Sequence, residues 1–187
     1  MKSVGCVLLM GGKSSRMGED KAFLKYKEQY FWERIAKEME GIARTYLSLA
    51  SKEKAPRTHY EIIEDEYKEI GPIGGIHAGL KYAKEDFLFF APCDIPTLNH
   101  MLIRKVIKEV SSEYEGVVLA SKAGKVYPTV GIYSKKLLDV LEFQIKQKDY
   151  RLMNLVRNYR VKVVPIDTLG INHDLININT KLDYSLL

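Results

Sequence analysis

Short apolar runs alternate along the chain with segments whose apolar residues recur at helical spacing. Residues 4–10 and 87–91 are almost uninterrupted apolar runs, the pattern of strands buried on both faces of a parallel sheet. Residues 31–42 and 98–110 carry apolar positions three and four apart, which predicts amphipathic helices. This alternation predicts an α/β protein with a three-layer α/β/α, Rossmann-like fold around a mostly parallel central sheet.

The remaining elements follow from the same two patterns. Further strands are expected at residues 45–50, 60–63, 116–120, 126–133, 161–166 and 175–178. Further helices are expected at residues 73–83, 135–146 and 150–158. Asn99 lies at the start of the helix predicted at 98–110 and is its expected N-cap. No repeat or linker divides the 187 residues, so 1–187 is expected to form one domain.

Composition and charge narrow the classes of function. The 29 Lys and Arg residues exceed the 24 Asp and Glu residues by five, but these basic residues are scattered along the chain. RNA binding is not indicated, because the sequence has no basic stripe interleaved with aromatic residues. Two cysteines are too few for a disulfide framework. No apolar stretch approaches the ~20 residues of a membrane span, and the first residues lack a cleavage site. These features predict a cytoplasmic protein without membrane or nucleic-acid partners.

The first candidate for chemistry is the segment directly after the first predicted strand. Residues 11–21 read GGKSSRMGEDK, in which three glycines free backbone amides to bind anionic oxygens. Lys13, Arg16 and Lys21 add three cations. The segment is not a P-loop, since Val7 stands where that motif needs glycine, and its glycine spacing differs from the dinucleotide fingerprint. A solvated surface turn is the alternative, but the combination favours phosphate binding.

Asp94 is the second candidate, because a buried strand delivers its carboxylate between Pro92 and Pro96. One carboxylate combined with substrate phosphates is the usual way in which proteins hold Mg²⁺. The alternative role of a helix cap is weakened by the better-placed Asn99. Cys93 is expected to be a packed, reduced thiol and not a nucleophile, since the neighbouring carboxylate would raise its pKa.

Several segments resemble those of one known family. Residues 9–21, LMGGKSSRMGEDK, are similar to the signature L-x-G-G-x-S-x-R-M-G-x-D-K of the molybdenum cofactor guanylyltransferases, or MobA-like proteins. Further similarities are Asp65 with the 71–76 run GPIGGI, the 90–96 run FAPCDIP, Arg151 with Met153, and the 177–180 run NINT. The resemblance extends from about residue 4 to 182. It implies the nucleotide-diphospho-sugar transferase type of fold.

The resemblance also implies a reaction and a set of site residues. A GMP unit would pass from GTP to the phosphate of a molybdopterin-type acceptor, with Mg²⁺ as cofactor and pyrophosphate as the second product. The implied catalytic residues are Arg16, Lys21 and Asp94, with Asp94 as the metal ligand. The implied nucleotide-binding residues are Leu9, Met10, Gly11, Gly12, Ser14, Gly18, Lys21, Ser51, Asp65, Gly71 and Asp94. The implied acceptor-binding residues are Gly75, Tyr127, Asn177 and Asn179.

Three positions depart from the family pattern. Met10 replaces the usual alanine, Ser51 stands near the position of an asparagine that contacts the nucleotide, and Tyr127 replaces a histidine. The change at Ser51 leaves the choice between guanine and cytosine open. The alternatives are therefore a molybdopterin cytidylyltransferase, a sugar-phosphate nucleotidyltransferase, or a catalytically silent nucleotide-binding module. A monomer or weak oligomer is expected, with room for transient contact with other molybdenum cofactor biosynthesis proteins.

Overall fold

The computed structural model describes residues 2–11, 21–171, 175–178 and 180–185, with only the backbone of Lys21 and Lys181. Within these ranges the chain forms one large sheet of seven strands in the order β5-β4-β1-β6-β8-β7-β9. The strands are β1 Val4–Leu9, β4 Thr45–Leu49, β5 Glu61–Glu64, β6 Phe87–Pro92, β7 Gly116–Ala120, β8 Val126–Ser134 and β9 Val161–Pro165. Only β8 runs antiparallel to its neighbours, so the mostly parallel sheet is confirmed.

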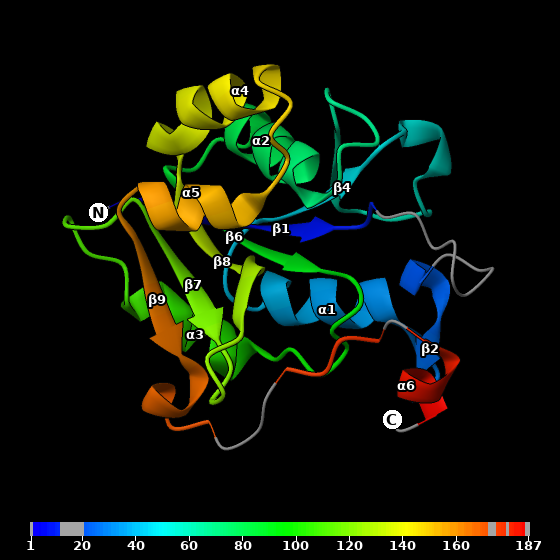
Figure 1. Ribbon diagram of the computed structural model, residues 1–187. Coiled ribbons are helices and arrows are strands. Elements are labelled where there is room, and N and C mark those ends of the chain that lie inside the picture. Colours follow the sequence, from blue (N-terminus) through cyan, green and yellow to red (C-terminus); the bar gives the residue numbers. More distant parts are fainter. Residues whose placement is uncertain (1, 12–20, 172–174, 179, 186–187) are drawn as a thin grey trace.

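Helices cover both faces of this sheet (Figure 1). One face carries α1 (Phe31–Glu40) and α3 (His100–Lys108). The other face carries α2 (Pro72–Tyr82), α4 (Leu138–Lys146) and α5 (Leu152–Asn158). The predicted three-layer α/β/α architecture is therefore confirmed. Among these described helices, none combines the length and the apolar character that a membrane span requires.

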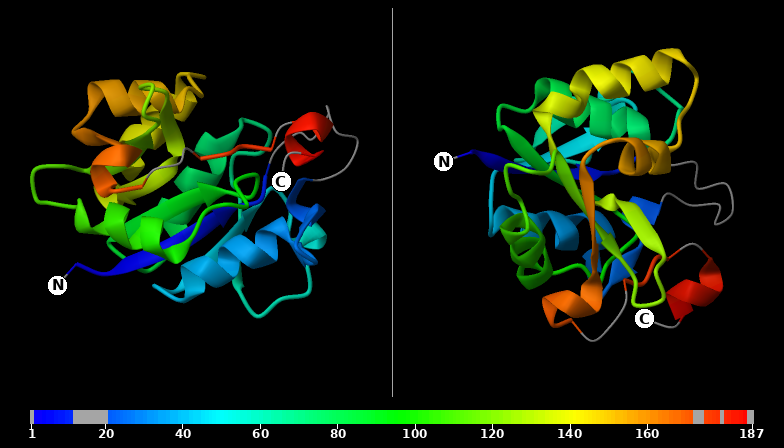
Figure 2. Two further views of the ribbon diagram at one scale, coloured as in Figure 1. Left: turned by 90° about the horizontal axis from the view of Figure 1, so that it is seen from below. Right: turned by 60° about the vertical axis from the view of Figure 1, so that its left-hand side comes forward.

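The smaller elements gather at the ends of the sheet. A hairpin of β2 (Lys25–Tyr26) and β3 (Gln29–Tyr30) precedes α1. Figures 1 and 2 show α6 (Lys181–Ser185) beside this hairpin, where the Tyr184 hydroxyl donates to the Lys25 carbonyl at 2.7 Å. The 3-10 helices are η1 (Lys21–Phe23), η2 (Lys52–Lys54), η3 (Lys135–Leu137) and η4 (Ile166–Leu169).

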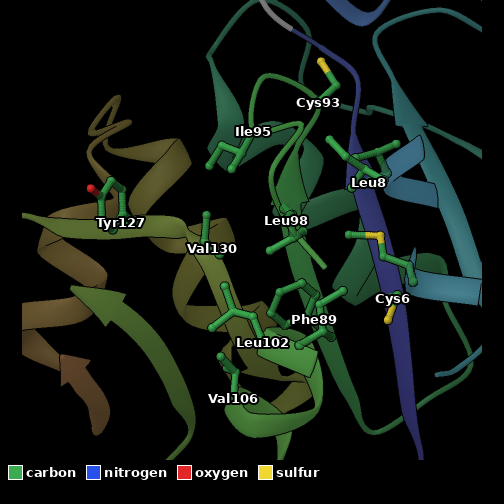
Figure 3. Close-up of a cluster of buried hydrophobic side chains, with 14 of the residues drawn as sticks. Cys6, Leu8, Phe89, Cys93, Ile95, Leu98, Leu102, Val106, Tyr127 and Val130 are labelled. Carbon is green, nitrogen blue, oxygen red and sulfur yellow. The ribbon is translucent and has the colours of Figure 1, made fainter. Parts of the chain in front are cut away.

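Central strand β1 contributes to a core on each face of the sheet. Cys6 and Leu8 point toward α1 and α3, whereas Val7 and Leu9 point toward α2. Figure 3 shows the first of these cores, in which Phe89 of β6 lies between β1 and the α3 side chains. This two-sided burial explains why the sequence of β1 is apolar at every position from Cys6 to Leu9.

Local signals explain where two of the helices begin. The Asn99 side chain accepts a hydrogen bond from Leu102 N at 3.0 Å, which confirms it as the N-cap of α3. Gly71 precedes α2 with φ at 82°, a backbone angle that other residues rarely adopt. Pro72 then fills the first turn, where the missing N–H is tolerated.

Two expected elements differ in the structure. The strand expected at 175–178 is wrong, because these residues pair with no strand and their recorded backbone bond is from Ile178 N to Asp94 O at 2.8 Å. The helix expected at 135–146 is divided into η3 and α4. The hairpin and α6 were not expected. The remaining predicted strands and helices are present, with ends shifted by a few residues.

Close contact between α2 and the sheet at Gly79 gives a stability prediction. A Cβ there would lie 2.6 Å from Phe90 Cε1 and 3.2 Å from Val7 Cγ2. Gly79→Ala is therefore expected to lower the free energy of unfolding by about 1–3 kcal/mol, through overpacking. Gly41→Ala is the control, because a Cβ there meets nothing closer than 3.8 Å. Urea unfolding measures both; a stabilised Gly79→Ala variant would contradict the described packing.

Candidate active site

Backbone hydrogen bonds join the carboxyl ends of four neighbouring parallel strands at one edge of the sheet. They run from Asp65 N to Leu49 O at 2.8 Å, from Met10 N to Ser48 O at 2.9 Å, and from Cys93 N to Leu9 O at 3.1 Å. These bonds continue the pairing of β5, β4, β1 and β6 beyond the strands. The segments that follow these four strands therefore all begin at the same end of the sheet.

The position of this edge in the topology favours ligand binding. From β1 the chain moves outward to β4 and β5, and then returns to place β6 on the other side of β1. This reversal between β1 and β6 is a topological switch point, outside whose carboxyl ends α/β proteins bind ligands. Gly11 follows β1 and Asp94 follows β6. The structure thus brings Gly11, the first residue of the glycine-rich segment, and the loop of the predicted metal ligand Asp94 to the same end of the sheet.

The side chain of Asp65 lies beside Gly11, the first residue of the glycine-rich segment. Its Oδ1 accepts a 2.6 Å hydrogen bond from the Ser48 hydroxyl, and a Cβ on Gly11 would lie 3.7 Å from its Oδ2. The side chain is only 8% exposed. Burial raises the pKa of Asp65 above the usual value, although the Ser48 hydrogen bond opposes the shift. The carboxylate is an acceptor held ready beside Gly11.

Two hydrogen bonds fix the loop that carries Asp94. Arg34 of α1 donates from Nε to the Pro96 carbonyl at 2.8 Å. Ile178 N donates to Asp94 O at 2.8 Å, which brings the segment containing Asn177 against the loop. The Asn177 Oδ1 atom is buried and has no hydrogen-bond partner among the described residues. A carboxylate and an orphaned amide oxygen are hard ligands of the kind that Mg²⁺ prefers, so these residues fit that ion.

A small cavity opens between the ends of β1 and β4. Its volume is about 100 Å³, and its lining residues are Met10, Gly11, Phe23, Leu49, Ala50, Ser51 and Lys54. The sequence predicted Met10, Gly11 and Ser51 as site residues but missed Phe23 and Lys54. Lys54 lies in a polar run of ordinary surface character, so it is recognised as a site residue only because it lines the same cavity as Gly11.

The backbone of Lys21 begins η1, whose Phe23 lines the same cavity as Gly11 and Ser51. Lys21 thus starts an element that reaches the site edge, while its side chain lies outside the described residues. Several other predicted site residues also lie outside them: Gly12, Ser14, Arg16, Gly18 and Asn179. Their roles stay predictions.

Gly75 is required by packing whatever its role toward a ligand. A Cβ there would lie 2.7 Å from both Ser48 Oγ and a Leu9 methyl, so a larger residue would push α2 away from the sheet beneath Asp65. Tyr127 has a buried ring at the start of β8 and is well separated from Cys93 in Figure 3. Acceptor binding by Gly75 and Tyr127 stays a prediction.

The two cysteines are buried and form no disulfide with each other. Burial raises the pKa of the Cys6 thiol to about 12, which keeps it protonated at neutral pH. Cys93 packs at the edge of the core shown in Figure 3. Among the described residues, no three His, Cys, Asp or Glu side chains are grouped closely enough to hold a metal without substrate.

A glycine-rich segment and a carboxylate at the switch point of a parallel sheet define a nucleotide-binding α/β protein. The chain belongs to the MobA-like NTP transferase family, whose domain model matches residues 6–176. The resemblance and the type of fold inferred from the motifs are thereby confirmed. The family relation also agrees with an enzyme that transfers a nucleotidyl group.

Individual relatives cover nearly the whole chain. A protein of Aquifex aeolicus named "Probable molybdenum cofactor guanylyltransferase" is 32% identical over 179 residues, 95% of this chain and 87% of the relative. A Clostridium perfringens protein of the same name is 32% identical over 158 residues, 84% and 79% of the two chains.

Solved structures share the same fold. A protein of Aquifex aeolicus superposes with a TM-score of 0.79 at 31% identity, over 96% of this chain and 95% of that one. The molybdopterin-guanine dinucleotide biosynthesis protein A of Archaeoglobus fulgidus superposes with a TM-score of 0.83 at 19% identity, over 97% and 95%.

Burial of Asp65 makes stability depend on pH. Its folded-state pKa lies above the unfolded value of about 3.9, so the folded state binds the proton more tightly. Stability from this group is therefore complete at low pH and is lost as the pH rises through the raised pKa. Asp65→Asn is expected to gain stability relative to the parent over that rise. Urea unfolding from pH 3.5 to 7 measures the difference, and a constant difference would contradict the shift.

Proposed function

We propose that this protein transfers a GMP unit from GTP to the phosphate of a molybdopterin-type acceptor. An acceptor phosphate oxygen bonds to the α-phosphorus of GTP, the bond from that phosphorus to the bridging oxygen breaks, and pyrophosphate leaves. The observation that supports this most directly is the 3.1 Å bond from Cys93 N to Leu9 O. It ties the start of the glycine-rich segment to the loop of Asp94, as one bound triphosphate requires.

The reaction depends on positioning more than on proton transfer. The acceptor phosphate is already an anion, so the site needs no strong general base. It must instead bring two polyanions together and stabilise charge on the departing pyrophosphate. Amides of the segment after Gly11 cradle the triphosphate, and Arg16 and Lys21 neutralise it. One cation ~4 Å from a phosphate oxygen contributes on the order of 4 kcal/mol at an effective dielectric of ~20, before desolvation.

Asp94 and Asn177 would hold Mg²⁺ beside the reacting phosphate. When bound, the ion supplies positive charge against the phosphate oxygens. The buried orphan oxygen of Asn177 and the bond from Ile178 N to Asp94 O support this pairing of ligands. Arg34, through Pro96, holds the loop in place while charge develops on the substrate.

Asp65 has a separate role toward the nucleotide. Its Oδ1 is occupied by Ser48, whereas its Oδ2 faces Gly11. An acceptor in this position suits the hydroxyl groups of the ribose, with the base in the cavity near Ser51 and the phosphates along the glycine-rich segment. The relatives' shared name supports a guanine nucleotide as the ligand that this arrangement receives.

Two substitutions test the charged groups of the reaction. Lys21→Ala and Asp94→Ala are each expected to slow pyrophosphate release from GTP by about 10²–10³-fold or more, the typical loss of a preorganised electrostatic group. The assay contains Mg²⁺ and molybdopterin. Lys13→Ala is the control and should change the rate little, because the family signature leaves its position free.

The outcomes separate the alternatives. Near-normal turnover of Lys21→Ala would remove that residue from the mechanism, and a loss in Lys13→Ala as deep as that in Lys21→Ala would mean that the cations are assigned wrongly. Product formed from CTP and not GTP would identify a cytidylyltransferase. Product formed only with a sugar phosphate would identify that class of acceptor. GTP binding without turnover on any acceptor would indicate a silent module.

Asn177 is tested through the metal dependence. Asn177→Leu keeps the size of the side chain but removes the orphan oxygen, and it should raise the Mg²⁺ concentration for half-maximal activity by about tenfold or more. Asn177→Asp, which keeps an oxygen at that position, is the matched variant and should need no more Mg²⁺ for half-maximal activity than the parent protein does. An unchanged Mg²⁺ dependence in Asn177→Leu would exclude Asn177 as a ligand.

A further inference from the structure

The cavity beside Gly11 is small and partly apolar. Its volume of about 100 Å³ lies well below the ~300–1,000 Å³ of sites for drug-sized ligands. Apolar side chains of Met10, Phe23 and Leu49 contribute to its wall. Among the described lining residues, the polar side chains are Ser51 and Lys54. Its size and apolar wall suit the base of a nucleotide better than the polar ribose and phosphates.

Both polar side chains of this cavity can donate a hydrogen bond to a ligand. The Ser51 Oγ already accepts a 3.3 Å hydrogen bond from Glu53 N, so its own hydrogen is left for another partner. The Lys54 ammonium has three donors and no acceptor. No carboxylate or carboxamide side chain is among the described lining residues. The side-chain surface is therefore complementary to a base edge that carries acceptors.

Hydrogen bonds within η2 set the position of Lys54. Lys54 N donates to Ser51 O at 3.2 Å, and Ala55 N donates to Lys52 O at 3.0 Å. Lys52 stands on the same short helix but does not line the cavity. The two lysines thus share an element, a charge and an exposed surface, and they differ in their access to the ligand.

We propose that Lys54 selects the base, by donating to the carbonyl oxygen at position 6 of guanine. Guanine presents acceptors at O6 and N7, whereas adenine and cytosine present amino groups at the corresponding edge. An amino group facing Lys54 and Ser51 would find two donors. This inference rests on the proposed function only in taking a nucleoside triphosphate as the ligand. It supplies a basis for guanine preference where Ser51 replaces the family's asparagine.

A chemical probe removes this contact. 2-Aminopurine riboside triphosphate has the rings, ribose and phosphates of GTP but lacks the carbonyl at position 6 and the hydrogen on N1, and the Lys54 variant separates the two changes. Dissociation constants for GTP and this analogue are measured with Mg²⁺ and without acceptor. The parent protein is expected to favour GTP by about tenfold or more, as hydrogen bonds from charged groups are the stronger class. In Lys54→Met the ratio should fall by about tenfold relative to the parent, through weaker GTP binding.

Two further variants complete the test. Lys52→Met is the matched control and should keep the parent ratio, and Lys54→Arg, which retains a charged donor, should keep most of it. Equal weakening of both ligands by Lys54→Met would mean that Lys54 acts on the phosphates, and unchanged dissociation constants for both ligands would mean that it makes no contact with either part of the nucleotide. Either result overturns the proposal. Failure of transfer to molybdopterin leaves this binding ratio unaffected, so the two proposals fail separately.

Discussion

Pairing on both sides of β1 is the constraint on which the site depends. The strand is bonded to β4 and β6 along its length, and two bonds extend this pairing past its end, from Met10 N to Ser48 O and from Cys93 N to Leu9 O. The segments that follow three strands therefore start from one rigid edge. Side chains that follow directly from such an edge keep fixed distances from one another without long side-chain networks. Electrostatic catalysis requires this fixed spacing.

Rigid placement has an energetic cost at Asp65. A carboxylate that is 8% exposed is poorly solvated, and the single hydroxyl of Ser48 offsets only part of this loss. The glycine at position 75 allows α2 to approach Ser48 and Leu9 closely enough to bury the pair. A residue predicted to bind the nucleotide, a core strand and a helix packing contact are thus coupled. The buried Asp65 carboxylate lowers the free energy of unfolding, and in return the fold holds a hydrogen-bond acceptor facing Gly11.

Local signals made much of the fold predictable. The apolar runs of β1 and β6, the cap at Asn99 and the Gly-Pro step at 71–72 each act within a few residues. The hairpin between β2 and β3 was missed because its turn is Lys27-Glu28, both with positive φ, instead of the usual asparagine and glycine. The run at 175–178 alternates like a strand, yet its neighbour is the Asp94 loop and not a sheet edge.

The residues of the candidate site likewise fall into those that local motifs predict and those that they do not. Asp65, Ser51, Gly11 and Asp94 could be found from motifs, since each follows a strand in a characteristic run. The bond between Ser48 and Asp65 depends on the register of β4 against β5, which no local pattern contains. Lys54 and Phe23 depend on how two short helices fold back over the strand ends. Residues fixed by local backbone geometry are readable from the sequence, and those fixed by packing between distant segments are not.

In the proposed function, phosphate binding and base selection are separate parts of one end of the sheet. The glycine-rich segment and Asp94 would serve groups that every nucleoside triphosphate shares, which agrees with their place in a general signature. The cavity is assembled from η1, η2 and the end of β4, where a few side chains change the surface without disturbing the bonds that join the strands. A fold arranged in this way can alter its choice of base by substitutions such as that at Ser51 and still retain the reaction.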